Sequence, residues 1–151
     1  MEIENKKCVI ILDEALPLGI LTNTAAVLGV TLGKERNEII GPSIKDKSGY
    51  EHEGIVAIPI PILKGNEQLI RELRQRCYTD EFSDCTIVDF SDVAQSCKDY
   101  DDYTEKLKLQ EEACLHYFGI GICGDKKKDK QAHWQFTFIT IIILSYFCIY
   151  L

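Results

Sequence analysis

Short runs of apolar residues alternate with segments of helical periodicity along residues 7–123. Residues 7–12, 55–63, 85–90 and 115–123 are rich in Val and Ile, which is typical of strands buried in a sheet. Between them, apolar residues recur at spacings of three and four, as they do on one face of a helix. This alternation predicts an α/β fold, a three-layer sandwich with a mixed, mostly parallel four-stranded sheet.

The first predicted helix, residues 17–33, carries no charged side chain. Pro17 suits its first turn because the fixed φ of proline is already helical. A helix without any charged face is expected to be covered on more than one side. Asn23 and Thr24 stand out in it, since Asn is a poor residue for a helix interior. They indicate a hydrogen bond to a neighbouring segment or to a ligand.

Two other segments depart from regular alternation. Residues 34–54 are polar and contain Gly-Pro and Ser-Gly turn signals, which predict a long excursion with a short hairpin. Pro59 and Pro61 face the same side of the second strand, and neither has an N–H to donate. This predicts a strand that leaves the sheet partway. Asn66 is expected to cap the helix that follows.

Polar residues stand at the carboxyl ends of the predicted strands, where α/β folds bind ligands. Aspartates after the first and third strands could form a cluster that binds Mg²⁺ or works in acid–base catalysis. The alternative is structural, because Asp commonly ends strands and caps helices. The predicted site has Asp89 and Asp92 as catalytic candidates and Asp13, Glu14, Asn23, Thr24 and Ser91 as ligand-binding candidates.

The sequence GIGICG at residues 119–124 has the pattern of a dinucleotide-binding loop. That chemistry requires the glycines in a turn between a strand and a helix. Here they lie within a predicted strand, so we interpret them as positions where a neighbouring element approaches closely. P-loop, zinc-site and hydrolase signatures are absent from the sequence, and we expect no cofactor and no metal.

Seven cysteines are present, an odd number, and no two of them have C-x-x-C spacing. Cys8, Cys85, Cys114 and Cys123 lie in apolar runs, where thiols behave as small hydrophobic side chains. We expect buried, reduced cysteines and a cytoplasmic protein. The apolar run near the N-terminus is also too short for the core of a signal peptide.

The distribution of charge divides the chain into a domain, residues 1–130, and an apolar tail, residues 131–151, which has no Asp, Glu, Lys or Arg. Fourteen of the last 18 residues are apolar. As a helix these residues would span about 27 Å, close to the roughly 30 Å of a bilayer core, and several lysines precede them. The tail therefore fits a membrane anchor. A strand over residues 136–144 or an aberrant chain end are the alternatives.

Several motifs together resemble a bacterial family, the domain of unknown function 2000 family. They are KCVIILDEALPLG at 7–19, NTAAVLG at 23–29, GP at 41–42, IPIPIL at 58–63 and VDF at 88–90. The resemblance covers about residues 5–130. That family is related in fold to peptidyl-tRNA hydrolase II. The relation implies a mixed four-stranded sheet with helices on both faces, and often a homodimer.

The resemblance to peptidyl-tRNA hydrolase II also implies catalytic positions. That enzyme uses a lysine-rich segment at the start of its first helix and an Asp followed by a Thr after its third strand. Asp89 or Asp92 could match the Asp and Ser91 or Ser96 the hydroxyl, but residues 18–23 contain no lysine. The lysines that would meet tRNA phosphates are therefore missing.

Two functions follow from these observations. The first is a binding module for a small molecule or a protein that keeps the fold without the hydrolase chemistry. The second is hydrolysis of the ester of peptidyl- or aminoacyl-tRNA, with Arg71, Arg74 and Arg76 as phosphate contacts. The net charge of −7, from 17 basic and 24 acidic residues, disfavours tRNA as a partner and favours the binding module.

Overall fold

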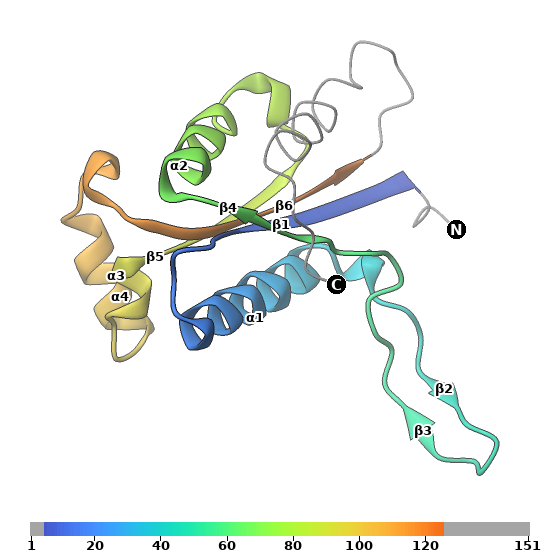
Figure 1. Ribbon diagram of the computed structural model, residues 1–151. Helices are drawn as coiled ribbons and strands as arrows, with labels where there is room; N and C mark the ends of the chain where they lie inside the picture. The colour runs from blue at the N-terminus through green and yellow to red at the C-terminus, as the bar shows by residue number, and fades with distance from the viewer. Residues whose placement is uncertain (1–4, 126–151) are drawn as a thin grey trace.

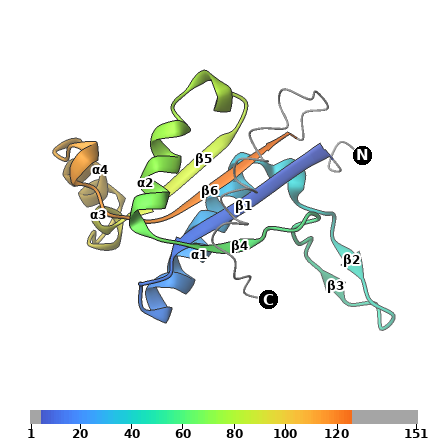
Figure 2. The same cartoon turned by 45° about the horizontal axis from the view of Figure 1, so that its top comes forward.

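A four-stranded sheet lies between helix α1 on one face and helix α2 on the other, as Figure 1 and Figure 2 show. This is a computed structural model, and it describes residues 5–125. The strand order is β4-β1-β6-β5. The strands are β1 (Lys6–Asp13), β4 (Ile62–Gly65), β5 (Thr86–Ser91) and β6 (Tyr117–Asp125), and the two covering helices are α1 (Leu18–Glu35) and α2 (Glu67–Arg76).

The sheet is mixed but mostly antiparallel, which corrects the expectation of a mostly parallel sheet. Among the strands of residues 5–125, only β1 and β4 pair in parallel, whereas β6 is antiparallel to both β1 and β5. The helices α3 (Asp92–Gln95) and α4 (Tyr100–Lys108) and the short turn η4 (Glu112–Cys114) link β5 to β6 at one end of the sheet. Because this connection does not cross a face, the chain re-enters the sheet in the opposite direction.

The glycines of β6 bring α1 close to the sheet. A Cβ atom on Gly119 would lie 2.9 Å from Thr24 Cγ2, and one on Gly121 would lie 2.9 Å from Leu32 Cδ1. Leu28 and Leu32 of α1 are fully buried against this surface. Burial of a leucine contributes about 1.5–3 kcal/mol. The interpretation of these glycines as sites of close approach is confirmed.

Helix α2 begins as the sequence predicts. The Leu69 backbone N–H donates to Asn66 Oδ1 at 2.9 Å, so Asn66 is its N-cap. Ile70 and Leu73 on its inner face are buried in the cluster that includes Val9 of β1. The short turn η3 (Asp80–Phe82) follows and leads into β5.

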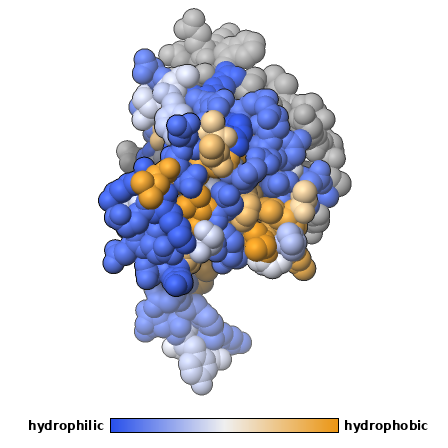
Figure 3. Space-filling model, turned by 90° about the vertical axis from the view of Figure 1, so that its left-hand side faces the viewer, coloured by the Kyte–Doolittle hydropathy of each residue, from blue (hydrophilic) through white to orange (hydrophobic). Residues whose placement is uncertain are grey.

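The strand that contains the two prolines joins the sheet late. Pairing with β1 begins at Ile62, although the Pro61 carbonyl already accepts a hydrogen bond from Ile10 N at 3.0 Å. The prediction that this segment cannot be fully paired is confirmed, but the strand enters the sheet after the two prolines and does not leave it partway, and residues 55–61 lie outside it. The polar excursion before it contains the turn η2 (Asn37–Ile39) and the hairpin β2 (Ile44–Lys45) and β3 (Glu51–His52). The predicted hairpin projects away from the sheet, and its surface is mainly hydrophilic in Figure 3.

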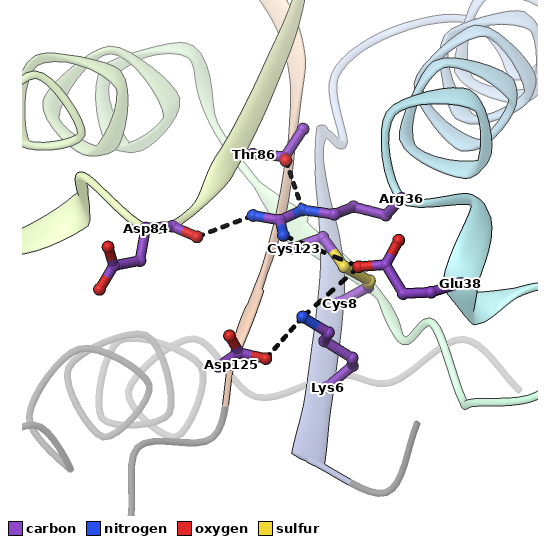
Figure 4. The surroundings of a disulfide bond; sticks show 8 residues. All are labelled: Lys6, Cys8, Arg36, Glu38, Asp84, Thr86, Cys123 and Asp125. Atoms are coloured by element: carbon purple, nitrogen blue, oxygen red, sulfur yellow. Dashed lines mark hydrogen bonds and ion pairs between the residues drawn. A yellow bond between two sulfur atoms is a disulfide. The ribbon is translucent and has the colours of Figure 1, made fainter. Parts of the chain in front are cut away.

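Cys8 and Cys123 form a disulfide bond, which corrects the expectation that they are reduced. They are directly opposite each other in the antiparallel pair β1–β6, and their Cα atoms are 4.1 Å apart. Figure 4 shows the charged side chains that surround this bond. Cys114, expected to be buried, is exposed, and Cys85 is half-buried.

The predicted apolar tail, residues 131–151, lies outside the described residues. Within residues 5–125, no helix combines the length and the apolar character needed to cross a membrane.

Candidate functional site

A groove opens between the N-terminal half of α1 and the edge of the sheet at β4. It exists because α1 packs over β6, β5 and β1, so that this helix does not cover β4 and the segment before it. Its volume is about 610 Å³, within the range of small-molecule sites. The lining residues are Leu12, Glu14, Leu18, Leu21, Thr22, Ala25, Pro59, Ile60, Pro61, Ile62, Leu63 and Lys64.

The walls of this groove are apolar, and two of its three polar residues, Glu14 and Lys64, lie together at one end. Lys64 pairs in register with Leu12 near the carboxyl end of β1, and Glu14 follows that strand. Lys64 Nζ lies 3.7 Å from Glu14 Oε2. The third polar residue, Thr22, donates its hydroxyl hydrogen to the Leu18 carbonyl at 3.0 Å. The groove therefore offers a long apolar surface with one ion pair at its mouth.

The start of α1 faces the same end. Leu18, its first residue, lines the groove and is 76% exposed. Pro17 provides no side-chain cap, and the first turn contains no acidic residue. The partial positive charge at this helix N-terminus is therefore not neutralised from within the helix.

Asp89, the first catalytic candidate, lies on the opposite face of the sheet. Its neighbours in β5, Val88 and Phe90, face α1, so Asp89 faces α2. Arg74 Nε donates to Asp89 Oδ2 at 2.6 Å, and the guanidinium carbon of Arg74 lies 4.0 Å from the centre of the Tyr78 ring. Asp89 is thus part of an ion pair that attaches α2 to the sheet.

The carboxylates of Asp13 and Asp92 accept hydrogen bonds from the backbone. Asp13 Oδ1 accepts from Ala15 N at 3.1 Å, and Asp92 Oδ1 accepts from His116 N at 3.1 Å. Asp13 ends β1 and Asp92 follows β5, with β6 between these two strands. No group of three His, Cys, Asp or Glu residues within residues 5–125 is placed to hold a metal ion. The arrangement of the three aspartates therefore favours the structural alternative.

The remaining predicted residues lie between α1 and the α3 end of the sheet. Asn23 Nδ2 donates to Gln95 Oε1 of α3 at 3.2 Å, which is the expected hydrogen bond to a neighbouring segment. Thr24 is fully buried, and its Oγ1 has no hydrogen-bond partner among residues 5–125. Ser91 is buried at the end of β5. Of the predicted site residues, only Glu14 lines the groove.

The predicted phosphate-contacting arginines all make interactions within the protein, and the partners of two of them are defined. Arg71 donates to the carbonyl groups of Glu112 at 3.2 Å and Ala113 at 3.4 Å, and also to that of Leu115. Arg74 is held by Asp89. Both guanidinium groups thus connect α2 to the rest of the fold.

Most residues of the groove were missed because each is an ordinary apolar residue. Their signal was indirect. The uncharged helix was expected to be covered on more than one side, and Pro59 and Pro61 predicted an incompletely paired strand. These two features lie side by side and together form the walls of the groove.

Comparisons with known proteins agree with this architecture. The family model described as "Protein of unknown function (DUF2000)" matches residues 6–139. A solved structure, the protein of unknown function Atu0240 from Agrobacterium tumefaciens strain C58, superposes with a TM-score of 0.72 at 18% identity. The match covers 81% of this chain and 88% of that protein. At this identity the similarity concerns the fold alone. The sequence matches no curated protein.

Proposed function

The chain belongs to the DUF2000 family of proteins of unknown function, and from the groove beside α1 we propose that it is a binding module for a small, largely apolar molecule. The observation that carries this proposal is the apolar groove of about 610 Å³. Nine of its twelve lining residues are apolar. Apolar walls with a few placed polar groups are characteristic of small-molecule sites.

The energetics of the exposed walls support binding. Leu18 is 76% exposed and Ile62 is 37% exposed, so both leave apolar surface in contact with water. Contiguous apolar patches of this kind on protein surfaces often mark binding sites. A ligand that covers them gains about 25 cal/mol for each Å² of apolar surface removed from water.

A relation to peptidyl-tRNA hydrolase II remains part of the proposal at the level of fold only. The Arg74–Asp89 ion pair and the internal contacts of Arg71 support binding over ester hydrolysis. A general acid or base must reach the proton it transfers, and the Asp89 carboxylate is already bonded to Arg74. The net charge of −7 also works against binding of tRNA.

The groove can be tested with a neutral, apolar fluorescent probe such as Nile red. Ala25 lines the groove, whereas Ala26 is exposed on the outer face of the same helix. We expect Ala25→Trp to fill the groove and weaken binding at least about tenfold, a loss of roughly 1.4 kcal/mol. Ala26→Trp is the matched control and should bind like the wild type. Thermal unfolding of both variants checks that they are folded. Equal binding by both variants would refute the proposal.

The hydrolase function has its own test. The test measures hydrolysis of a blocked aminoacyl-tRNA at low salt by the full-length wild type and by Asp89→Asn. We expect the wild type to release no more amino acid than the variant does. Turnover by the wild type that Asp89→Asn abolishes would show that Asp89 takes part in chemistry. In that case the binding module would be the wrong function.

A further inference from the structure

The polarity of the groove restricts its ligand further. We infer that it binds a linear acyl chain that ends in a free carboxylate, with the carboxylate at Lys64 and the chain along α1. This inference rests on the proposed function, because it names the ligand class of the same groove. It follows from the position of the charges, the length of the walls and the start of α1.

The walls of the groove are elongated. Along α1 they run from Leu18 to Ala25, eight residues whose seven steps correspond to about 10 Å of helix. On the other side they run along residues 59–64, which in extended conformation correspond to about 16 Å. The lining beyond the mouth is apolar except for Thr22, whose hydroxyl hydrogen is donated to the backbone of α1. A long, thin, apolar chain fits such walls better than a compact polar molecule.

The mouth of the groove favours an anionic head group. The ammonium group of Lys64 and the uncapped N-terminus of α1 both provide positive charge there. Lys64 extends from a paired strand and its side chain is 25% exposed, so the cation is held in place. A carboxylate at this position can accept charge-assisted hydrogen bonds, which are stronger than those between neutral groups.

Glu14 occupies the place that we assign to the ligand's carboxylate. Its side chain is 56% exposed and reaches Lys64 at 3.7 Å, beyond the length of a normal hydrogen bond. Exposed ion pairs of this kind contribute little to stability, so a ligand can displace Glu14 at low cost. Meanwhile Glu14 N donates to the Gly65 carbonyl at 3.0 Å, which keeps the backbone at the mouth fixed. Glu14 thus competes with the ligand and lowers its affinity.

The inference is tested by calorimetric titration of the full chain with monomeric octanoate, decanoate and dodecanoate. Affinity should rise about fourfold for each added methylene group, as expected from the transfer of a CH₂ group out of water. Decanoate should bind at least about tenfold more tightly than decyltrimethylammonium, because its charge complements Lys64.

Variants at the mouth separate the head group from the chain. Lys64→Gln should weaken decanoate binding about tenfold but change Nile red binding far less than Ala25→Trp does, because the probe carries no charge. Glu14→Gln should strengthen decanoate binding a few-fold, since the competing carboxylate is removed. Lys34→Gln is the matched control, because the Lys34 side chain is 81% exposed at the far end of α1, and it should bind decanoate like the wild type.

The outcomes distinguish the inference from the proposed function. If Ala25→Trp abolishes Nile red binding but Lys64→Gln and Lys34→Gln bind decanoate equally well, the groove binds ligands and the carboxylate inference is wrong. If Ala25→Trp leaves Nile red binding intact, both proposals are wrong. If decanoate does not bind, while Ala25→Trp weakens sedimentation with phosphatidylcholine vesicles, the groove takes its chains from a bilayer and the inference is overturned.

Discussion

Helix α1 meets two strands of the same sheet in different ways. Over β6 it packs tightly, because Gly119 and Gly121 have no side chains to hold it away. Beside β4 it leaves a groove of about 610 Å³. The helix has the same uncharged character along its whole length up to Gly33, so its composition does not explain the difference.

The difference lies in the two strands. β6 has nine residues and is paired on both sides, whereas β4 has four residues at an edge of the sheet and follows two prolines. The glycines allow α1 to lie close to β6. The position of α1 in turn determines that the surface beside β4 is left open by this helix. The packed side therefore provides stability, and the open side provides a surface for a ligand.

The largest effect should come from the disulfide on the packed side. Cys8 and Cys123 are separated by 115 residues along the chain, so their bond restricts the unfolded chain strongly. We expect the double variant Cys8→Ala/Cys123→Ala to lose about 2–5 kcal/mol in its free energy of unfolding. Cys114→Ser is the control. Because Cys114 is exposed, this substitution should lower the free energy of unfolding by less than about 0.5 kcal/mol. Urea unfolding measures both, and equal stabilities would contradict this account.

The close packing of α1 on β6 should be disrupted by a single methyl group added to β6. A Cβ atom on Gly119 would lie 2.8 Å from Leu12 Cδ2 and 3.1 Å from the Ile11 carbonyl oxygen. Gly119→Ala should therefore lower the free energy of unfolding by about 1–3 kcal/mol. Gly29→Ala in α1 meets no atom within 4 Å and should raise it by up to about 1 kcal/mol, because alanine favours the helix. Chemical denaturation of the two variants should give opposite signs.

Much of the fold was predictable because its signals are local. The first strand was expected at residues 7–12 and is Lys6–Asp13, and the first helix was expected at residues 17–33 and is Leu18–Glu35. The cap at Asn66 and the glycines of β6 also followed from neighbouring residues. Strand direction was not predictable in this way, because it depends on β6 entering between β1 and β5.

The candidate site depended on information that the sequence holds only indirectly. The pairing of Cys8 with Cys123 requires the register of two distant strands. The groove requires the lateral position of α1 on the sheet, which the residues at the groove do not themselves determine. Asp89 is instructive, since strand alternation places it on the face opposite Val88 and Phe90. The expected cluster combined residues from both faces.

The face of the sheet covered by α2 contrasts with the open groove, because an ion pair between charged side chains connects the helix to the sheet. Asp89→Asn removes the partner of Arg74, whose side chain is only 17% exposed. The variant should therefore lower the free energy of unfolding by about 1–3 kcal/mol. The control is Glu105→Gln, because Glu105 is 76% exposed and its contact with Lys108 should contribute less than about 0.5 kcal/mol.

A second measurement on Asp89→Asn reports the local charge. Burial, and then the negative charge of Asp89, raise the pKa of Tyr103 and Tyr117 above their usual value. The variant should therefore lower the pKa of both tyrosines, as measured by ultraviolet difference titration. An unchanged titration together with unchanged stability would show that the ion pair does not form in solution.

The smallest effect should come from the charges around the disulfide, shown in Figure 4. Glu38 lies 3.4 Å from Lys6 Nζ and 3.7 Å from Arg36 Nη1. A hydrogen bond from its own backbone N–H, and then Lys6, lower the pKa of Glu38 below its usual value of 4.5. Since the pKa is lower in the folded state, this stabilisation is complete above about pH 4.5 and is lost as the pH falls through the folded value.

Glu38→Gln should therefore cost about 0.2–0.5 kcal/mol at pH 7, a small value because the side chain is 40% exposed. The difference from the wild type should shrink as the pH falls below about 4.5 and disappear once the wild-type carboxylate is protonated as well. Urea unfolding at pH 7 and at a series of acidic pH values measures this. The opposite behaviour is expected of Lys6, since Asp125 raises its pKa above 10.5 and that contribution is lost only in more alkaline solution. A difference for Glu38→Gln that does not shrink at any acidic pH would mean that Glu38 acts through packing and not through its charge.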